Sequence, residues 1–95
     1  MKPNIKVEFW PGTDNFRSIE YFNKKDQLHN ENGPARQTWH KNGQKLSEQF
    51  WFNNKLHNEK GPATITYFAI NGSIAFEEYW LDGKLYSKKN WEKQK

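Results

Sequence analysis

An eight-residue segment that occurs twice constrains this chain more than any other feature. Residues 28–35 read Leu-His-Asn-Glu-Asn-Gly-Pro-Ala, and residues 56–63, 28 positions later, match them at seven of the eight positions. The run Phe-Trp-Phe-Asn-Asn-Lys-Leu at 50–56 returns at 79–85 as Tyr-Trp-Leu-Asp-Gly-Lys-Leu, and an earlier copy begins at Tyr21 with one extra residue before Leu28. Self-similarity at a period of about 20–50 residues is the signature of a repeat architecture. We therefore predict that one structural unit is built more than once.

Each unit has the pattern of β-hairpins. Asn53-Asn54 and Asp82-Gly83 tolerate positive φ at both central positions of a type I′ turn, and Asn42-Gly43 and Asn71-Gly72 are signals of the same kind. The segments between these pairs are rich in β-branched and aromatic residues, which favour strands. We expect six main strands in three hairpins, at residues 5–10, 16–22, 36–40, 46–52, 64–68 and 74–81.

The end of the chain departs from this pattern. Ser87 can act as the N-cap of a helix over residues 88–95, and Trp91 would then pack on the last hairpin. The alternative is a frayed basic tail with Trp91 exposed. We predict one all-β domain over residues 1–95, an antiparallel hairpin meander with a short C-terminal capping helix. Its parts are an N-terminal hairpin at 5–22, repeats at 21–49 and 50–78, a partial repeat at 79–86 and the helix at 87–95.

The repeated His-x-x-x-Gly-Pro segments are interpreted as structural corners. A catalytic residue rarely needs two copies one repeat apart, which is how His29 and His57 are arranged. We expect each imidazole to hydrogen-bond backbone across its corner, the glycine to supply an unusual φ, and the proline to fix the direction of the chain. The corner residues are His29, Gly33, Pro34, His57, Gly61 and Pro62.

Rows of aromatic side chains are predicted on both faces of the sheet, because successive strand residues point to opposite sides. On the other strand of each hairpin, Trp39 matches Tyr67 and Phe9. An exposed apolar row usually marks an interaction site, whereas a covered row is structural, and both interpretations stay open. The candidate partner-binding residues are Phe22, Trp51 and Trp80 on one face, then Tyr21, Phe50 and Tyr79 on the other.

The spacing of residues 77–85 resembles a MORN-type repeat, with an aromatic strand, a turn that ends in Gly-Lys and a corner that contains histidine. Residues 48–68 are similar, and the resemblance covers about residues 16–86. The period here is longer, and Gln49 or Glu78 stands where MORN units have glycine. The corners look more like the Leu-His-x-x-x-Gly-Pro-Ala repeats of phage, giant-virus and bacterial proteins. This resemblance implies an antiparallel meander that binds protein; some arrays of this type are linked to membrane lipids or to antitoxin-like roles.

The amino-acid composition indicates how large a core the protein can form and in which compartment it is expected. Only 34% of the residues are hydrophobic, but 16 of the 95 are aromatic, which suits an ordered fold with a thin core. There is no cysteine, which suits a reducing compartment, and no apolar run of the roughly 18 residues that span a membrane. Thirteen of the 15 basic residues are lysine, and asparagine is also frequent. Their codons are AT-rich, which suggests a low-GC bacterium or its phage, and we expect a cytoplasmic protein, in the host cytoplasm if phage-encoded.

Motifs that indicate catalysis are missing. Glu77 and Glu78 are adjacent on a strand, so they point to opposite faces and cannot form an acid–base pair. The sequence has no glycine-rich phosphate loop and no nucleophile elbow, and His40 is the one further histidine that could join a metal site. We therefore expect neither enzyme activity nor a cofactor nor a metal ion.

The function that these observations favour is a non-enzymatic protein-binding module that uses an aromatic sheet face. Its fuller form is a phage-encoded inhibitor or adaptor that acts on a host protein. One alternative is nucleic-acid binding through a basic patch near the C-terminus, at Lys84, Lys88, Lys89 and Lys93. Another is an antitoxin-like partner protein or a homo-oligomer, because the edge strands of an open meander invite pairing with another chain.

Overall fold

The fold is an antiparallel all-β meander with one short C-terminal helix, as predicted, and its main sheet has seven strands where six were expected. The computed structural model describes residues 4–95. The strand order is β1-β2-β3-β4-β7-β8-β9, and β5 and β6 form a separate small hairpin. The strands are β1 Ile5–Phe9, β2 Phe16–Tyr21, β3 Arg36–Trp39, β4 Lys45–Gln49, β5 Trp51–Phe52, β6 Lys55–Leu56, β7 Thr64–Tyr67, β8 Ile74–Leu81 and β9 Lys84–Tyr86, and the helix is α1 Lys88–Gln94.

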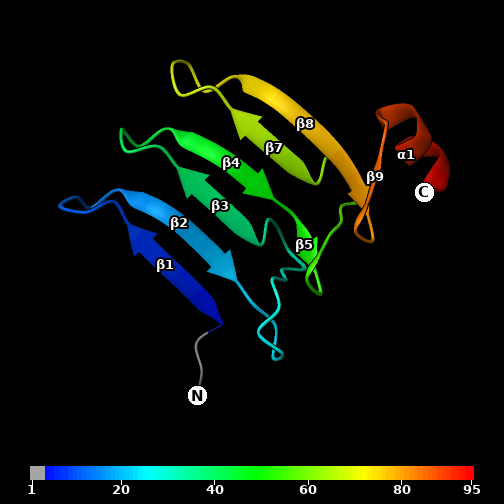
Figure 1. The fold of residues 1–95 in the computed structure, drawn as a ribbon, viewed down its shortest axis with the longest axis horizontal. Helices are drawn as coiled ribbons and strands as arrows, with labels where there is room; N and C mark the ends of the chain where they lie inside the picture. The colour runs from blue at the N-terminus through cyan, green and yellow to red at the C-terminus, as the bar shows by residue number, and fades with distance from the viewer. Residues whose placement is uncertain (1–3) are drawn as a thin grey trace.

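The sheet is a single layer. The molecule measures 46 × 39 × 16 Å along its principal axes, and the strands that pack closely together are neighbours in the strand order or belong to the β5–β6 hairpin. The three main hairpins β1–β2, β3–β4 and β7–β8 lie side by side, with their turns at one end and the corners at the other (Figure 1). The helix lies at the edge opposite β1 (Figure 1). Two broad faces of the sheet are therefore available to solvent or to a partner.

The type I′ turns form where they were predicted, but the Asn-Gly turns differ. Asn53 and Asn54 both have positive φ, as do Asp82 and Gly83. In the main hairpins positive φ falls on the glycine alone, at Gly43 and again at Gly72. These loops are longer than two residues. The His40 N–H donates to the Gln44 carbonyl in one of them, and the Phe68 N–H donates to the Ser73 carbonyl in the other. The expectation of two-residue turns at 42–43 and 71–72 was wrong, because each asparagine side chain instead accepts the N–H two residues ahead.

Each main hairpin contains a β-bulge at the same place, next to its turn. The register shifts between Glu8 and Phe9, between Thr38 and Trp39, and between Thr66 and Tyr67. At a bulge, two residues of one strand lie opposite one residue of the partner strand, and the side chains beside it change direction. The extra residue lies on the second strand of each hairpin, so Phe16, Lys45 and Ile74 come to the same side of the sheet as their partners Phe9, Trp39 and Tyr67.

The corners join successive small hairpins by the same set of bonds. Each His Nδ1 accepts the first N–H of the next type I′ turn, from Asn53 to His29 and from Asp82 to His57, at 2.9 Å in both cases. The Asn30 N–H donates to the Trp51 carbonyl, and the equivalent Asn58 N–H donates to that of Trp80. The two histidines therefore have alike surroundings, and the predicted hydrogen bond between each imidazole and the backbone is present.

The corner glycines behave differently from the prediction. Gly33 and Gly61 are absent from the residues with positive φ, so the unusual φ expected there was wrong. The bend is made by an asparagine side chain instead. The Asn30 amide donates to the Pro34 carbonyl at 3.1 Å and accepts the Asn32 N–H at 3.1 Å, and Asn58 makes the same two bonds in the next corner.

The core is a single row across the sheet, at the end where the corners lie. The strand registers place the fully buried Ala35 between Tyr21 and Phe50, and the fully buried Ala63 between Phe50 and Tyr79. Large and small side chains alternate along this row, so the methyl group of each alanine fills the space between two rings. This packing explains why alanine ends the repeated Gly-Pro-Ala segment.

The predicted capping helix is present. Ser87 is its N-cap, and its hydroxyl accepts the Asn90 N–H at 3.2 Å. Trp91 is only 4% exposed: its ring lies 4.9 Å from that of Tyr79, and its Nε1–H donates to the Asn58 carbonyl at 3.0 Å. The helix therefore covers the last ring of the core row, and the alternative of a frayed tail is excluded.

Candidate functional site

One face of the sheet carries most of its apolar side chains and is here called the ring face. Alternation along the strands, together with the registers and bulges, assigns its members. The helix covers Tyr79 at one end of this face, but the part over β1 and β2 is open. The apolar residues of the ring face are Ile5, Val7, Phe9, Phe16, Ile19, Tyr21, Ala35, Trp39, Phe50, Ala63, Ile65, Tyr67, Ile74 and Tyr79.

Three rings form a contiguous strip on the open part of the ring face. The centroids of Phe9 and Phe16 are 5.3 Å apart, and those of Phe16 and Trp39 are 5.5 Å apart. Phe9 is 51% exposed and Phe16 is 42% exposed, so within residues 4–95 no segment covers them. A contiguous apolar strip of this kind is the feature that most often marks a protein-binding surface.

A polar cluster interrupts the ring face near its centre. The Glu48 carboxylate accepts hydrogen bonds from the Tyr67 hydroxyl at 2.6 Å, from Gln37 at 3.2 Å and from Lys45 at 3.2 Å. Burial alone would raise the pKa of Glu48, but the hydrogen bond from Tyr67 and the charge of Lys45 outweigh burial and lower it. Burial and the adjacent carboxylate raise the pKa of Tyr67 to about 12. Glu48 is therefore ionised and fully hydrogen-bonded, which suits a structural anchor.

The opposite face, here called the hydroxyl face, is mainly polar. A row of hydroxyl side chains crosses it, and a second row carries charges and amides, with the Arg36 Nε 3.2 Å from a Glu20 oxygen. Its apolar members are Phe76, which is 55% exposed, and Trp80, which follows Glu78 by two residues on β8. The members of the hydroxyl face are Lys6, Glu8, Ser18, Glu20, Arg36, Thr38, Ser47, Gln49, Thr64, Thr66, Phe76, Glu78 and Trp80.

The six candidate partner-binding residues are all partly buried. Their equivalence between repeats holds, since Phe22 pairs with Leu28, Trp51 with Leu56 and Trp80 with Leu85. The indole N–H groups of the two tryptophans are used internally, by Gln49 at 3.1 Å and by Glu78 at 3.2 Å. The six partly buried candidates are Phe22, Trp51, Trp80, Tyr21, Phe50 and Tyr79.

The strip of Phe9, Phe16 and Trp39 consists of rings that sequence reasoning did not select. Phe9 and Trp39 were matched to Tyr67 by repeat, and Phe16 was not singled out at all. Their joint position depends on the bulges, which bring Phe16 opposite Phe9 instead of one residue away. The one signal for this strip in the sequence is the aromatic residue that recurs just before each main hairpin turn.

A groove of about 800 Å³ lies between the two corners. Phe50 and Trp51 of the six candidates line it, together with Phe52, whose ring lies 4.5 Å from His29 and 6.2 Å from His57. Glu31 and Glu59 stand on its rim, each near the histidine of its own corner. The groove is open, and its lining residues other than these three rings are polar or glycine, so it is a weaker candidate than the ring face.

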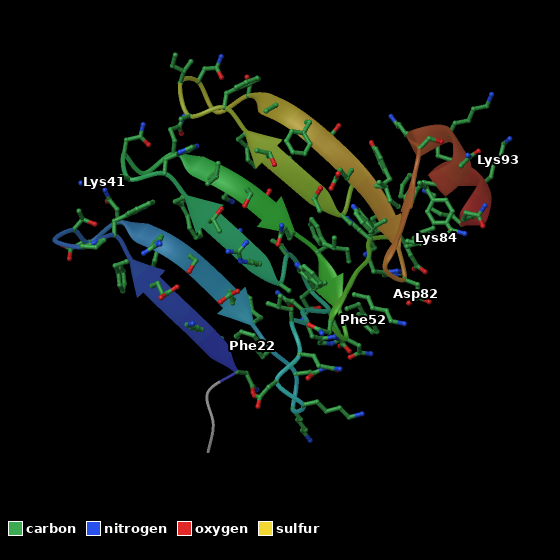
Figure 2. All side chains as sticks on the ribbon, viewed as in Figure 1. Phe22, Lys41, Phe52, Asp82, Lys84 and Lys93 are labelled. Carbon is green, nitrogen blue, oxygen red and sulfur yellow. The ribbon has the colours of Figure 1, made fainter. Side chains whose placement is uncertain are left out.

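The predicted basic patch is exposed, but the aromatic ring of its helix is not available. Lys84 on β9 and Lys93 on α1 lie at the helical end of the molecule, far from Lys41 at the β3–β4 turn (Figure 2). Stacking of bases requires an exposed ring, and Trp91 is buried against Tyr79. The exposed lysines of the patch are Lys84, Lys88, Lys89 and Lys93.

Comparisons with family models, with curated proteins and with solved structures found no match for this chain. The resemblance to MORN-type repeats therefore stays a proposal. Over residues 4–95, α1 is the single helix, and it is too short and too polar to cross a membrane. In the same residues no group of three potential metal ligands comes together.

Proposed function

We propose that this protein is a non-enzymatic module that binds a partner protein on the ring face. The observation that supports this most directly is the strip of Phe9, Phe16 and Trp39, in which both phenylalanine rings are exposed, on a sheet one layer thick. Aromatic anchors contribute a large share of the binding energy in protein interfaces. The strip is also rigid, since its rings project from paired strands and not from loops, and a rigid surface loses little entropy on binding.

The fuller proposal is a phage-encoded inhibitor or adaptor that acts on a host protein in the host cytoplasm. It rests on the AT-rich codon usage that the lysine and asparagine content suggests, and on the resemblance to MORN-type repeats. The absence of catalytic motifs in the sequence agrees with a role by binding.

The test is affinity capture from a bacterial lysate, followed by direct titration of the captured protein. Phe16→Ser removes the central ring of the strip and should weaken binding by about tenfold or more, as expected of an anchor residue. Phe76→Ser is the matched control, because it removes a similarly exposed ring from the hydroxyl face. Phe52→Ser removes a ring from the groove and tests that site separately.

The proposal predicts loss of binding with Phe16→Ser alone. Equal binding by wild type and Phe16→Ser would exclude the ring face, and loss with Phe52→Ser alone would assign the site to the groove. Tryptophan fluorescence of each variant checks that the fold is intact.

A further inference from the structure

The free edge of β1 is an unprotected strand edge of five residues, all of which are exposed. On the opposite side of the sheet, β9 pairs with Tyr79–Leu81 of β8 and α1 packs beside β9, while Ile74–Glu78 of β8 have a strand partner on their inner side alone within the described residues. An unprotected edge presents unpaired N–H and C=O groups to another strand, so a further strand can be added to β1.

The hydrogen bonds between the β1 and β2 ends of this hairpin show which backbone groups of β1 point toward β2 and which point away from the sheet. The Asn4 carbonyl accepts the Phe22 N–H, and the Trp10 N–H donates to the Asn15 carbonyl, so both residues face β2. Backbone groups alternate along an antiparallel strand. The outward-facing residues of β1 are therefore Ile5, Val7 and Phe9.

The sequence of β1 is self-complementary. It reads Ile5-Lys6-Val7-Glu8-Phe9, with apolar side chains on the ring face and charged ones on the hydroxyl face. If a second copy pairs antiparallel about Val7, Lys6 lies opposite Glu8 of the second copy and Glu8 lies opposite its Lys6. Ile5 then lies opposite Phe9, and Val7 opposite Val7, so the outward-facing residues form hydrogen-bonded pairs.

Neighbouring registers lack this complementarity. Pairing centred on Lys6 sets two lysines opposite each other, and pairing centred on Glu8 sets two glutamates opposite each other, which is destabilising. We infer that two copies of this chain associate through β1, antiparallel and centred on Val7, in a two-fold symmetric interface. The association joins the apolar strips of the two ring faces, since Val7 is 42% exposed and Phe9 is 51% exposed before pairing.

The first measurement is the mass in solution by sedimentation equilibrium. Wild type should move from 11.4 kDa toward twice that value as its concentration rises to about 1 mM, the range expected for a weak association. A mass that stays at 11.4 kDa throughout overturns the inference.

Charge variants test the register without touching the ring face. Glu8→Lys sets two lysine side chains opposite each other across the interface and should weaken the association by about tenfold or more. Lys6→Glu should do the same, although it also sets two carboxylates opposite each other within one chain, because Lys6 pairs with Glu20. The double variant Lys6→Glu/Glu8→Lys should recover the dimer. A mixture of the two single variants, one of them isotope-labelled, should form heterodimers that native mass spectrometry detects.

Val7→Pro tests the backbone bonds. The N–H that it removes points away from β2, so the pairing of β1 with β2 is kept and circular dichroism should be unchanged. The dimer should be lost, while Val7→Thr should retain it. Dimerisation of Glu8→Lys equal to wild type would overturn the register. None of these variants alters Phe16, so the outcome is separate from that of the proposed function.

Discussion

At the scale of single residues, the fold depends on a few small or polar side chains placed between large ones. Three hydrophobic residues of the described chain are buried, and the two with no exposed surface are the corner alanines Ala35 and Ala63. A core so thin leaves little tolerance for a change in volume, because neighbouring rings can move only into solvent or into each other.

Ala63→Leu is expected to destabilise the protein by about 1–3 kcal/mol, since added methyl groups would overlap Phe50 or Tyr79. The equivalent Ala35→Leu should behave alike. Urea unfolding measures both, with Ala69→Leu in the β7–β8 loop as a control at a partly exposed site. Leucine tolerated at both corners without loss of stability would contradict the packing of the row.

The bond between Glu48 and Tyr67 predicts how stability depends on pH. The pKa of Tyr67 is raised to about 12, so its contribution is complete below the ordinary value of 10.0 and is lost as pH rises from there toward 12. The pKa of Glu48 is lowered, so its contribution is present above 4.5 and is lost as pH falls through the lowered pKa. Chemical unfolding in both pH ranges gives the free energy of unfolding as a function of pH. This free energy should depend less on pH in Tyr67→Phe than in wild type, and an identical pH dependence in the two proteins would refute this assignment.

At the scale of elements, the corner histidine connects one small hairpin to the next. His57→Leu leaves the Asp82 N–H without its acceptor and should cost about 1 kcal/mol. His57→Asn is the matched control, because its side-chain oxygen can take the place of Nδ1. Hydrogen exchange at the Asp82 amide should speed up in His57→Leu alone. The same rate in both variants would show that the imidazole does not hold this turn.

The helix is held by its tryptophan. A seven-residue helix has little stability of its own, so Trp91→Ala should release it and cost about 3 kcal/mol. Trp91→Phe keeps a ring against Tyr79 but loses the bond to Asn58, and its cost should be about 1 kcal/mol. Calorimetry gives both values, and a helix signal that persists in Trp91→Ala would show that other contacts dock α1.

At the scale of the whole molecule, each repeat contacts mainly its neighbours, so one unit should be removable in register. Deletion of residues 36–63 joins Ala35 to Thr64 and lets β2 pair with β7 as it now pairs with β3. The register is kept because Arg36 and Thr64 are equivalent positions: both lie opposite Gln49. Thr64 would therefore take the place of Arg36 opposite Glu20. His29 would then accept the Asp82 N–H.

We expect the shortened protein to fold with a smaller urea m-value, since less surface is buried. Deletion of residues 36–62 is the control. It leaves one residue more, which turns every following side chain to the wrong face. If both deletions unfold, or both fold equally well, the repeats are not interchangeable units.

Much of the fold follows from local patterns. The 28-residue spacing, the type I′ pairs and the Ser87 cap each depend on neighbouring residues, so they predicted the hairpins, the alike corners and the helix correctly. The same reasoning failed at Gly33 and Asn42, where a side-chain amide forms the turn and no positive φ is needed at the predicted residue.

The exposed face was decided only by tertiary structure. Sequence alternation placed aromatic rows on both faces and favoured Trp51 and Trp80, whose indole groups the fold uses internally. Three bulges and the docking of Trp91 then determined which rings stay open, and both depend on pairing between strands distant in sequence. A periodic sequence determines which residues share a side of a strand, whereas the exposure of that side depends on what the remaining chain packs against it.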